Sequence, residues 1–586
     1  MKSIHGWMGR ILKIDLQYKS TKIIEPGIEL YKKFTGGRGL AGHYLRPYCT
    51  LQWESPEMPL LFFTGPLCGT GSPSSGLVYL VSVSPLTGCV SDCAICGEFG
   101  PELKRAGWDG IIITGRSEGL CGIKITDGEI EFSNAENLKG NPITTVFGSL
   151  SGKGASAASG PAAEQGILYS DIVFNDSHFT GGNGFGTVMH SKGLKYIDVQ
   201  GSGKTGVYDN GELNEARDDI LRLVSASPAL MGAPGISEYG TGAFLDLMQS
   251  RLMLPADNFR KTSFPGAGKL NAYSFRQRFG SAKGGCAGCP VLCKKSSSDG
   301  RTIPEFEAMA GFTSLTGNRE IDTVMAACVF CKEQGIDPFI AASSIACYTE
   351  VKRISPEKLD LMKLLEEIAF SRGDGELLKT GPKEIARALG KPELSMTVKG
   401  LPLPPADPRG AYGTALGYAV STKGGDYSHA FPLSHEILRK PVATERFSFS
   451  GKGRIIKLSE DMYAAADSLS ACRHIFLTAS LEEYSKVFRA VTGIEMSGHD
   501  LAICGERVCY NEKIMSHLRG FTSDDDDLSE RFFSEPGSSG NGIKISTINR
   551  EEFYAARERY YRVRGLAPDG APLKEKCEEL GLEWII

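Results

Sequence analysis

Three cysteines in a short glycine-containing stretch are the residues best suited to chemistry. Cys286, Cys289 and Cys293 form a C-x₂-C-x₃-C run, and such spacing lets one tight loop present several thiolates to the same inorganic core. Gly285 and Gly288 allow the backbone to come close to that core. The run favours an iron-sulfur cluster that takes a fourth ligand from elsewhere and transfers electrons. A zinc site and plain buried thiols are the alternatives that the spacing leaves open.

The composition describes a globular chain large enough to enclose a cofactor between domains. The 586 residues are 41% hydrophobic and 23% charged, and ~100 to 200 residues per domain predicts roughly three to five units. A formal net charge of -4 does not indicate binding to nucleic acid. No apolar run reaches the ~20 residues of a membrane span, and 16 cysteines without an export signal favour reduced thiols. We therefore expect a cytoplasmic protein with neither a membrane span nor a nucleic-acid partner.

The elements that must position these cysteines change character twice along the chain. Short apolar runs broken by Gly, Ser and Pro predict a β-rich region first, and apolar residues at three- and four-residue spacing then predict helices. A proline-rich stretch separates two helical parts. The expected fold class is α+β, with a β-rich base domain at 1–205 and mostly helical domains at 206–405 and 406–586. Strands are expected at 10–16, 60–64, 77–83, 110–115 and 166–173, and helices at 321–334, 356–370, 382–389, 459–472, 480–491, 500–519 and 550–564.

Motifs spread over the whole chain resemble those of one enzyme family. In chain order they are GWMGRIL (6–12), GGRGLA (36–41), TGPL (64–67), SPLTG (84–88), ELKRAGWD (102–109), GPA (160–162), YGT (239–241), PEFE (304–307), SMTVK (395–399), DPRGA (407–411) and LGYA (416–419). With the cysteine run, they make the sequence similar to the aldehyde ferredoxin oxidoreductase family of tungsten-pterin enzymes. The resemblance implies a β-rich base under two helical domains, with a bis-pterin metal site at their junction.

The resemblance also implies a fourth cluster ligand and two pterin-binding motifs. The family's Asp-x-x-Gly-Leu-Cys motif corresponds to residues 467–472, so Cys472 is expected to complete the cluster and Asp467 to accept hydrogen bonds from one pterin. The companion motif corresponds to residues 332–337, where Asp337 is kept but Lys332 replaces the first carboxylate. Glu333 is a partial substitute, although adjacent helical side chains point about 100 degrees apart. We expect one pterin to be held differently from the family's pattern.

The family's phosphate-binding positions are altered as well. Leu77 replaces an arginine, Ala94 and Cys96 replace Asn and Gly, and the glycine-rich loop at 178–186 has no Arg. Those positions help to hold phosphates and magnesium in the family, so the sequence leaves magnesium open. The loop's glycines still allow backbone N–H groups to line an anion, which makes them candidate cofactor contacts. These candidates are Gly181, Gly182 and Gly184.

The altered loop creates a second cysteine run. Cys89, Cys93 and Cys96 form a C-x₃-C-x₂-C pattern that mirrors the first run. One reading is a second cluster, and the other is reduced thiols packed near the cofactor. A second cluster would take its fourth ligand from Cys49, Cys68 or Cys121.

The expected catalytic residues follow two motifs. Glu307 matches the glutamate that the family places beside the metal, where a carboxyl with a raised pKa can move a proton. The family's histidine after Gly-Gly is missing, and Gly425 is followed by Asp426 and Tyr427, with His429 two residues further on. Tyr427 is a candidate donor to a substrate oxygen, and His429 is a candidate acid or base.

The resemblance implies an enzyme that oxidises an aldehyde to a carboxylic acid at a tungsten or molybdenum bis-pterin. Electrons would pass singly through a 4Fe-4S cluster to ferredoxin or a small iron-sulfur subunit. One alternative is a tungsten-pterin subunit acting reductively on an aromatic or thioester substrate, and another is a non-catalytic electron-transfer paralogue. Ala326 and Val329 replace the Glu-x-x-His pair that binds a bridging iron in some members, so no iron bridge is expected, and a homodimer is left open.

Overall fold

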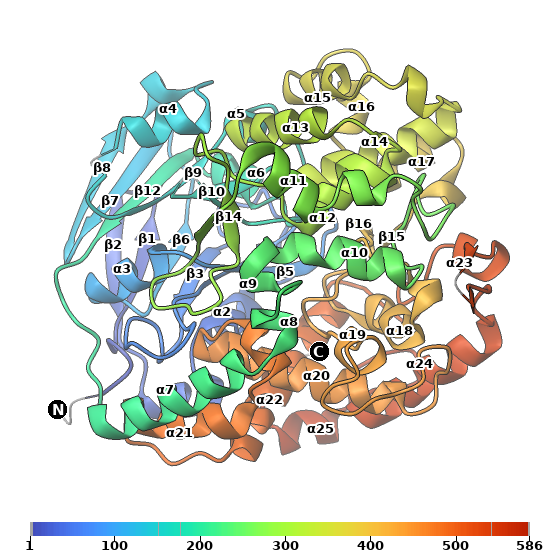
Figure 1. Ribbon diagram of the computed structural model, residues 1–586. Helices are drawn as coiled ribbons and strands as arrows, with labels where there is room; N and C mark the ends of the chain where they lie inside the picture. The colour runs from blue at the N-terminus through green and yellow to red at the C-terminus, as the bar shows by residue number, and fades with distance from the viewer. Residues whose placement is uncertain (1–3, 151, 176, 541, 584–586) are drawn as a thin grey trace.

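Two mixed β-sheets form the N-terminal part of the computed structural model, which describes residues 4–150, 152–175, 177–540 and 542–583 (Figure 1). Within these ranges each sheet has six strands. The first has the order β2 (Ser20–Ile24), β1 (Ile11–Asp15), β6 (Gly110–Thr114), β3 (Leu60–Thr64), β4 (Val78–Val83) and β5 (Val90–Ile95). The second has the order β11 (His178–Phe179), β10 (Ile172–Phe174), β9 (Ala155–Ser159), β12 (Leu194–Gln200), β7 (Cys121–Thr126) and β8 (Glu129–Asn134).

A hydrophobic core joins the two sheets. It takes Ile14, Phe62 and Ile111 from the first sheet and Ile123 and Val199 from the second, and all five side chains are fully buried. β1 and β6 pair in parallel, whereas β3 pairs with both β4 and β6 in antiparallel. Strands buried in this way read as continuous apolar runs, which is why the sequence predicts them well.

Helices from the C-terminal part pack against the first sheet through α2 (Gly37–Leu45). α2 contacts both α20 (Lys452–Leu469) and α22 (Gly498–Leu518). Gly37 has a φ of +38 degrees, and a Cβ built there would lie 2.2 Å from the carbonyl oxygen of Asp467. Only glycine permits so close an approach. The segment that carries Asp467 is thereby held directly against the N-terminal part of the chain.

The middle helices form a second body beside the sheets, coloured green and yellow in Figure 1. Their core includes α12 (Phe306–Ala310), α13 (Ile321–Gln334), α14 (Pro338–Lys352), α15 (Leu361–Ala369) and α17 (Pro382–Ala388). Asp337 caps α14, since its carboxylate accepts a hydrogen bond of 2.7 Å from the backbone N–H of Ile340. α12 continues into a π-helical turn at Gly311–Leu315, a feature frequent at functional sites.

The α+β fold class is therefore confirmed, and most expected elements form. The strand expected at 166–173 is wrong, because only Ile172–Phe174 joins the sheet. Ser170 instead forms a bridge with Ile336, and the N–H of Asp171 donates to the carbonyl of Gly335 at 2.8 Å, so this segment joins the middle helices. The boundaries at 205 and 405 stay predictions. In the described ranges no helix has the length and apolar character needed to cross a membrane.

Candidate active site

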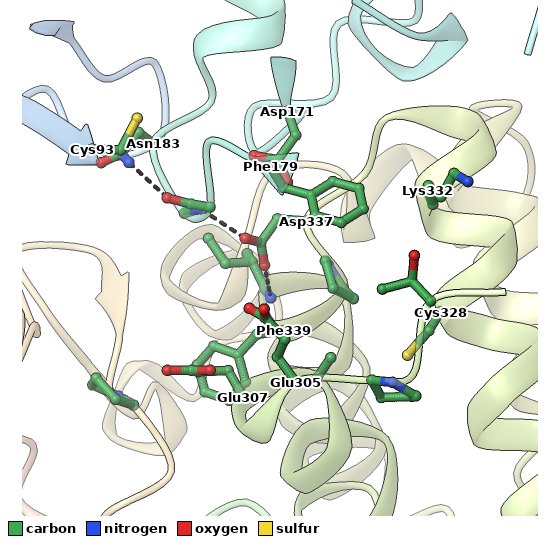
Figure 2. Close-up of a pocket in the computed structure, with 18 of the residues that line it drawn as sticks. Cys93, Asp171, Phe179, Asn183, Glu305, Glu307, Cys328, Lys332, Asp337 and Phe339 are labelled. Atoms are coloured by element: carbon green, nitrogen blue, oxygen red, sulfur yellow. Dashed lines mark hydrogen bonds between the residues drawn. The ribbon is translucent and has the colours of Figure 1, made fainter. Parts of the chain in front are cut away.

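Two adjoining cavities lie where the three parts of the chain meet. The larger has a volume of about 630 Å³ and the smaller about 350 Å³. The larger is lined by segments from the end of β5, the glycine-rich loop, α13, α14 and the loop at 423–428. Figure 2 shows Asp171 and Asp337 close to the loop that carries Asn183, with Glu305 and Glu307 further along the larger cavity. Residues shared by both cavities are Ala94, Glu305, Glu307, Tyr427, Ser428 and Arg473.

The predicted catalytic residues Glu307 and Tyr427 meet in the wall between the cavities. Glu307 lies in the first turn of α12, and the Tyr427 hydroxyl donates a hydrogen bond to its carboxylate. Desolvation in this enclosed wall is the main cause that raises the pKa of Glu307. Desolvation also acts on Glu305, but the ion pair with Lys294 outweighs it and lowers the pKa of Glu305. Two neighbouring carboxyls with opposite shifts are suited to different roles in proton transfer.

His429, the third predicted catalytic residue, lies behind the cavity wall rather than in it. It is 4% exposed, and its Nε2 is 2.5 Å from Oδ1 of Asp92. Asp92 lines the larger cavity together with Lys423. Burial alone would raise the pKa of Asp92, but Lys423, His429 and Arg38 hold it well below its usual range. His429 therefore positions Asp92 in this structure, and its role as acid or base stays a prediction.

The glycine-rich loop is held to α14 by Asp337. The backbone N–H of Gly182 donates to Oδ2 of Asp337 at 2.7 Å, and the side chain of Asn183 donates to the carbonyl of Gly181 at 2.6 Å (Figure 2). Gly181, Gly182 and Asn183 line the larger cavity. Gly184 caps α6 (Phe185–Ser191) instead, and a Cβ there would lie 2.1 Å from the Leu168 carbonyl oxygen. Gly181 and Gly182 thus line the cavity, and their role as cofactor contacts stays a prediction, while Gly184 contributes to packing.

Asp467 is enclosed by donors from the protein. Its carboxylate accepts hydrogen bonds from Arg38 at 3.0 Å, the Tyr79 hydroxyl at 2.6 Å and Nε of Arg473 at 2.8 Å, and its exposed fraction is 0%. Asp467 is not among the lining residues, but Arg473 lines both cavities. The predicted pterin contact at Asp467 stays a prediction. Its partner Arg473 is a residue that the sequence reasoning missed, although it directly follows Cys472.

The cysteines predicted to bind the cluster lie in one neighbourhood. The Ser74 hydroxyl donates to Sγ of Cys289 at 3.2 Å, and the Ser74 carbonyl accepts from the backbone N–H of Cys472 at 2.9 Å. The backbone N–H of Cys289 donates to the carbonyl of Cys286 at 3.1 Å. The side chain of Cys293 forms a hydrogen bond with that of His474, which lies two residues after Cys472. Among the described residues no group of three or more His, Cys, Asp or Glu side chains is arranged around a single metal ion.

The second cysteine run does not converge on one centre. Cys93 lines the larger cavity, whereas the thiol of Cys96 forms a hydrogen bond with the thiol of Cys286. Cys89 is 1% exposed, and burial raises its pKa to about 11. This separation favours reduced thiols near the cofactor over a second cluster.

Comparison with known proteins finds one family along nearly the whole chain. The profile of "Aldehyde ferredoxin oxidoreductase, N-terminal domain" matches residues 11–201, and that of "Aldehyde ferredoxin oxidoreductase, domains 2 & 3" matches residues 215–582. The tungsten-containing aldehyde ferredoxin oxidoreductase of Pyrococcus furiosus is 31% identical, covering 99% of both chains. The WOR-like subunit of an aliphatic sulfonate oxidoreductase from the same organism is 26% identical over 99% of this chain and 97% of its own.

A solved structure shows the same fold. It is the active site complex BamBC of benzoyl coenzyme A reductase with 1,5 dienoyl-CoA, which matches with a TM-score of 0.83 at 20% identity. The match covers 99% of this chain and 98% of the other. A β-rich base with two helical parts is therefore an arrangement already known from an experimental structure.

Proposed function

Because the chain belongs to the aldehyde ferredoxin oxidoreductase family, a family of tungsten-pterin oxidoreductases, we propose that it oxidises an aldehyde to a carboxylic acid. The observation that carries this proposal is the Glu307–Tyr427 contact in the wall between the two cavities. A carboxyl with a raised pKa, bonded to a hydroxyl and open to two cavities, is suited to proton transfer beside a carbonyl group.

The residues around the larger cavity fit a tungsten bis-pterin. Lys423 and Arg473 supply positive charge for phosphate groups, and Gly181 and Gly182 bring backbone to the same wall. A buried carboxylate oxygen of Asp171 without a hydrogen-bond partner among the described residues is ready to accept from the N–H groups of a heterocycle. When bound, the cofactor would supply the two-electron oxidation and reduction. Tungsten rather than molybdenum is proposed from the relatives.

Cys286, Cys289, Cys293 and Cys472 would hold a 4Fe-4S cluster that exchanges single electrons. The cluster loop reaches the surface at Gly285, Ala287 and Gly288, which are exposed. We propose ferredoxin or a small iron-sulfur subunit as the electron acceptor, because a surface loop gives such a partner short access to the cluster.

The chain's own residues can accept one of the protons that this reaction releases. Oxidation of an aldehyde with water gives a carboxylate, two electrons and three protons. Glu307 in its ionised form accepts a proton from the attacking water, and the Tyr427 hydroxyl stabilises that ionised form by its hydrogen bond. The smaller cavity would seat the rest of the substrate beside Glu307.

A second candidate is reduction of an aromatic substrate by the same site. Phe244, Phe306 and Phe431 all line the smaller cavity, and the Phe244 ring contacts both others, with ring centroids 5.9 Å apart for Phe244–Phe306 and 6.3 Å apart for Phe244–Phe431. Such a wall favours a flat apolar group. The direction of the reaction then distinguishes the two candidates.

The test is metal analysis and dye reduction on protein purified under strict anoxia. We expect about four irons and about one tungsten per chain, with dye reduction by aliphatic or aromatic aldehydes. Cys472→Ala should lose iron, whereas Cys504→Ala, which changes a buried thiol outside the predicted ligand set, should keep it. Iron without tungsten or molybdenum would favour an electron-transfer paralogue. Both metals without any aldehyde-dependent dye reduction would favour the reductive candidate.

A further inference from the structure

Asp171 presents an unused acceptor to the larger cavity. It directly precedes β10, lines the cavity and has an exposed fraction of 0%. Its Oδ1 accepts a hydrogen bond of 2.9 Å from the Thr180 hydroxyl. Its Oδ2 is buried and has no hydrogen-bond partner in the part of the chain that the structure describes. A buried carboxyl oxygen left without a partner is costly, so its retention needs a reason.

Among the described residues, the groups that shift the pKa of Asp171 include another acid, Asp337, and no cation. Burial is the largest cause that raises its pKa well above the usual range, and Asp337 raises it further. Hydrogen bonds from Thr180 and from the backbone of Gly181 oppose this shift without reversing it. Asp171 and Asp337, here called the acidic pair, therefore lie in the cavity wall with a net tendency to stay protonated.

The two members of the acidic pair differ in what they can offer a ligand. Both oxygens of Asp337 already accept backbone N–H groups, Oδ1 from Ile340 and Oδ2 from Gly182, each at 2.7 Å. Asp337 thus shapes the wall, while Asp171 keeps one oxygen available. Figure 2 shows Lys332 on the neighbouring helix with its amine turned away from Asp337, and this amine lies 4.0 Å from Oε1 of Glu333.

We propose that Asp171 is a binding residue for the N–H-bearing edge of the cofactor's nitrogen heterocycle. This inference rests on the proposed function, because it takes the pterin as the ligand. The free Oδ2 can accept a hydrogen bond from an N–H donor on a planar ring, and such a donor favours the ionised form of the carboxyl, whose hydrogen bonds are about twice as strong as neutral ones. A ligand of this kind satisfies Oδ2 and offsets the burial of the carboxyl. A divalent cation is a poorer occupant, since the described residues contain no group of three or more ligands arranged for one.

The experiment compares Asp171→Asn with a matched control, Asp198→Asn. Asp198 lies in the same sheet, is 4% exposed and accepts a hydrogen bond of 2.6 Å from the Ser156 hydroxyl, but it does not line the cavity. Tungsten, released pterin and iron are measured per chain after exhaustive anaerobic gel filtration. Asp171→Asn places an NH₂ group against ligand N–H donors, so we expect pterin and tungsten to be held about tenfold less tightly while iron stays at the wild-type level. Asp198→Asn should retain all three.

A second measurement separates ligand binding from a structural role. In protein produced without the cofactor, Asp171→Asn should raise Tm because it removes an unsatisfied buried acid, whereas Asp198→Asn should lower Tm. Wild-type pterin and tungsten retention in Asp171→Asn would overturn the inference, as would a fall in both Tm and iron. Asp171→Ala repeats the test without the competing amide and should also lose pterin but keep iron. Wild-type protein that contains no pterin would overturn the proposed function and this inference with it.

Discussion

Two sets of buried carboxyl groups lie at or near the larger cavity, and they differ in whether neighbouring cations neutralise their charge. Asp92 and Asp467 belong to a cation-paired set, in which Arg38 and Arg473 contact both carboxylates, at 4.0 and 3.0 Å for Arg38. The acidic pair, Asp171 and Asp337, has backbone and hydroxyl donors but no such cation. The charges of the cation-paired set are neutralised within the protein, although Oδ2 of Asp92, like Oδ2 of Asp171, has no hydrogen-bond partner among the described residues. The acidic pair has no such neutralising cation, and we propose a ligand as its partner.

The same contrast recurs at the start of α12, between its N-cap residue Glu305 and Glu307 in its first turn. Glu305 is paired with Lys294 and has a lowered pKa, while Glu307 bonds only to the neutral Tyr427 hydroxyl and has a raised pKa. A paired acid keeps its charge, and an unpaired acid in a dry wall has a raised pKa and exchanges its proton at a higher pH than an exposed acid. The comparison therefore assigns structure to the paired acids and chemistry or binding to the unpaired ones.

The largest expected effect is on turnover at Glu307. Glu307→Gln keeps the side-chain volume but cannot accept a proton, so aldehyde-dependent dye reduction should fall by about 10²- to 10⁴-fold with tungsten and iron retained. The wild-type rate should rise with pH through the raised pKa of Glu307, since the ionised form is the base. Glu305→Gln is the matched variant, and it should alter this pH dependence less. Equal turnover in Glu307→Gln and wild type, at equal metal content, would contradict the proposed role of Glu307 as the proton acceptor.

The second effect is on stability, and it tests the cation-paired set by replacing Arg38. This arginine is 1% exposed and also bonds to both oxygens of Glu512, at 2.7 and 2.6 Å. Arg38→Met would leave three buried carboxylates short of a partner, and the free energy of unfolding should fall by about 3 to 5 kcal/mol in chemical denaturation. Arg387→Met is the control, because its partner Glu384 is 40% exposed and the pair lies on the surface. The control should unfold at the wild-type midpoint.

The sequence predicts residues in short local motifs better than residues whose role depends on contacts between distant parts of the chain. Cys286, Cys289 and Cys293 are neighbouring candidate ligands of a type and spacing that chemistry restricts, and Glu307 lies in a short motif, so both can be found from the local sequence. Asp171 carries no such signal, because its meaning depends on Asp337 and on the cavity. Arg38 likewise contacts Asp467 across 429 positions of the chain. Predicting such contacts requires the packing of the domains, which no local pattern encodes.

The strand expected at 166–173 failed for the same reason. Its apolar residues are buried, as the pattern indicates, but they are buried partly against the middle helices. Ile167 and Tyr169 belong to the core of those helices, and Ile172 belongs to the core between the sheets. Periodicity reports that a segment is buried and does not report which body buries it. The turn between these two cores is what places Asp171 at the cavity.

The last expected effect, at most about 1.4 kcal/mol over a single pH unit, is a pH-dependent stability difference at Asp171, measured on cofactor-free protein. Burial and Asp337 raise the pKa of Asp171, so the folded state keeps a proton that the unfolded chain releases above about pH 4. The unfolded state then binds fewer protons, and this group makes the free energy of unfolding fall as pH rises. The other titratable groups facing Asp171 are Cys93 and Cys331, whose thiols stay neutral because burial raises their pKa.

Asp171→Asn has no proton to lose, so its stability advantage over wild type should vanish below about pH 4 and grow as pH rises. The gain is at most about 1.4 kcal/mol for each pH unit, up to the folded-state pKa. Urea denaturation at a series of pH values measures it, with Asp198→Asn as the reference for a partnered acid. A constant difference between Asp171→Asn and wild type from pH 4 to pH 8 would mean that Asp171 is already satisfied within the protein. The carboxyl groups of the acidic pair would then be as well stabilised within the protein as those of the cation-paired set, and the contrast between the two would disappear.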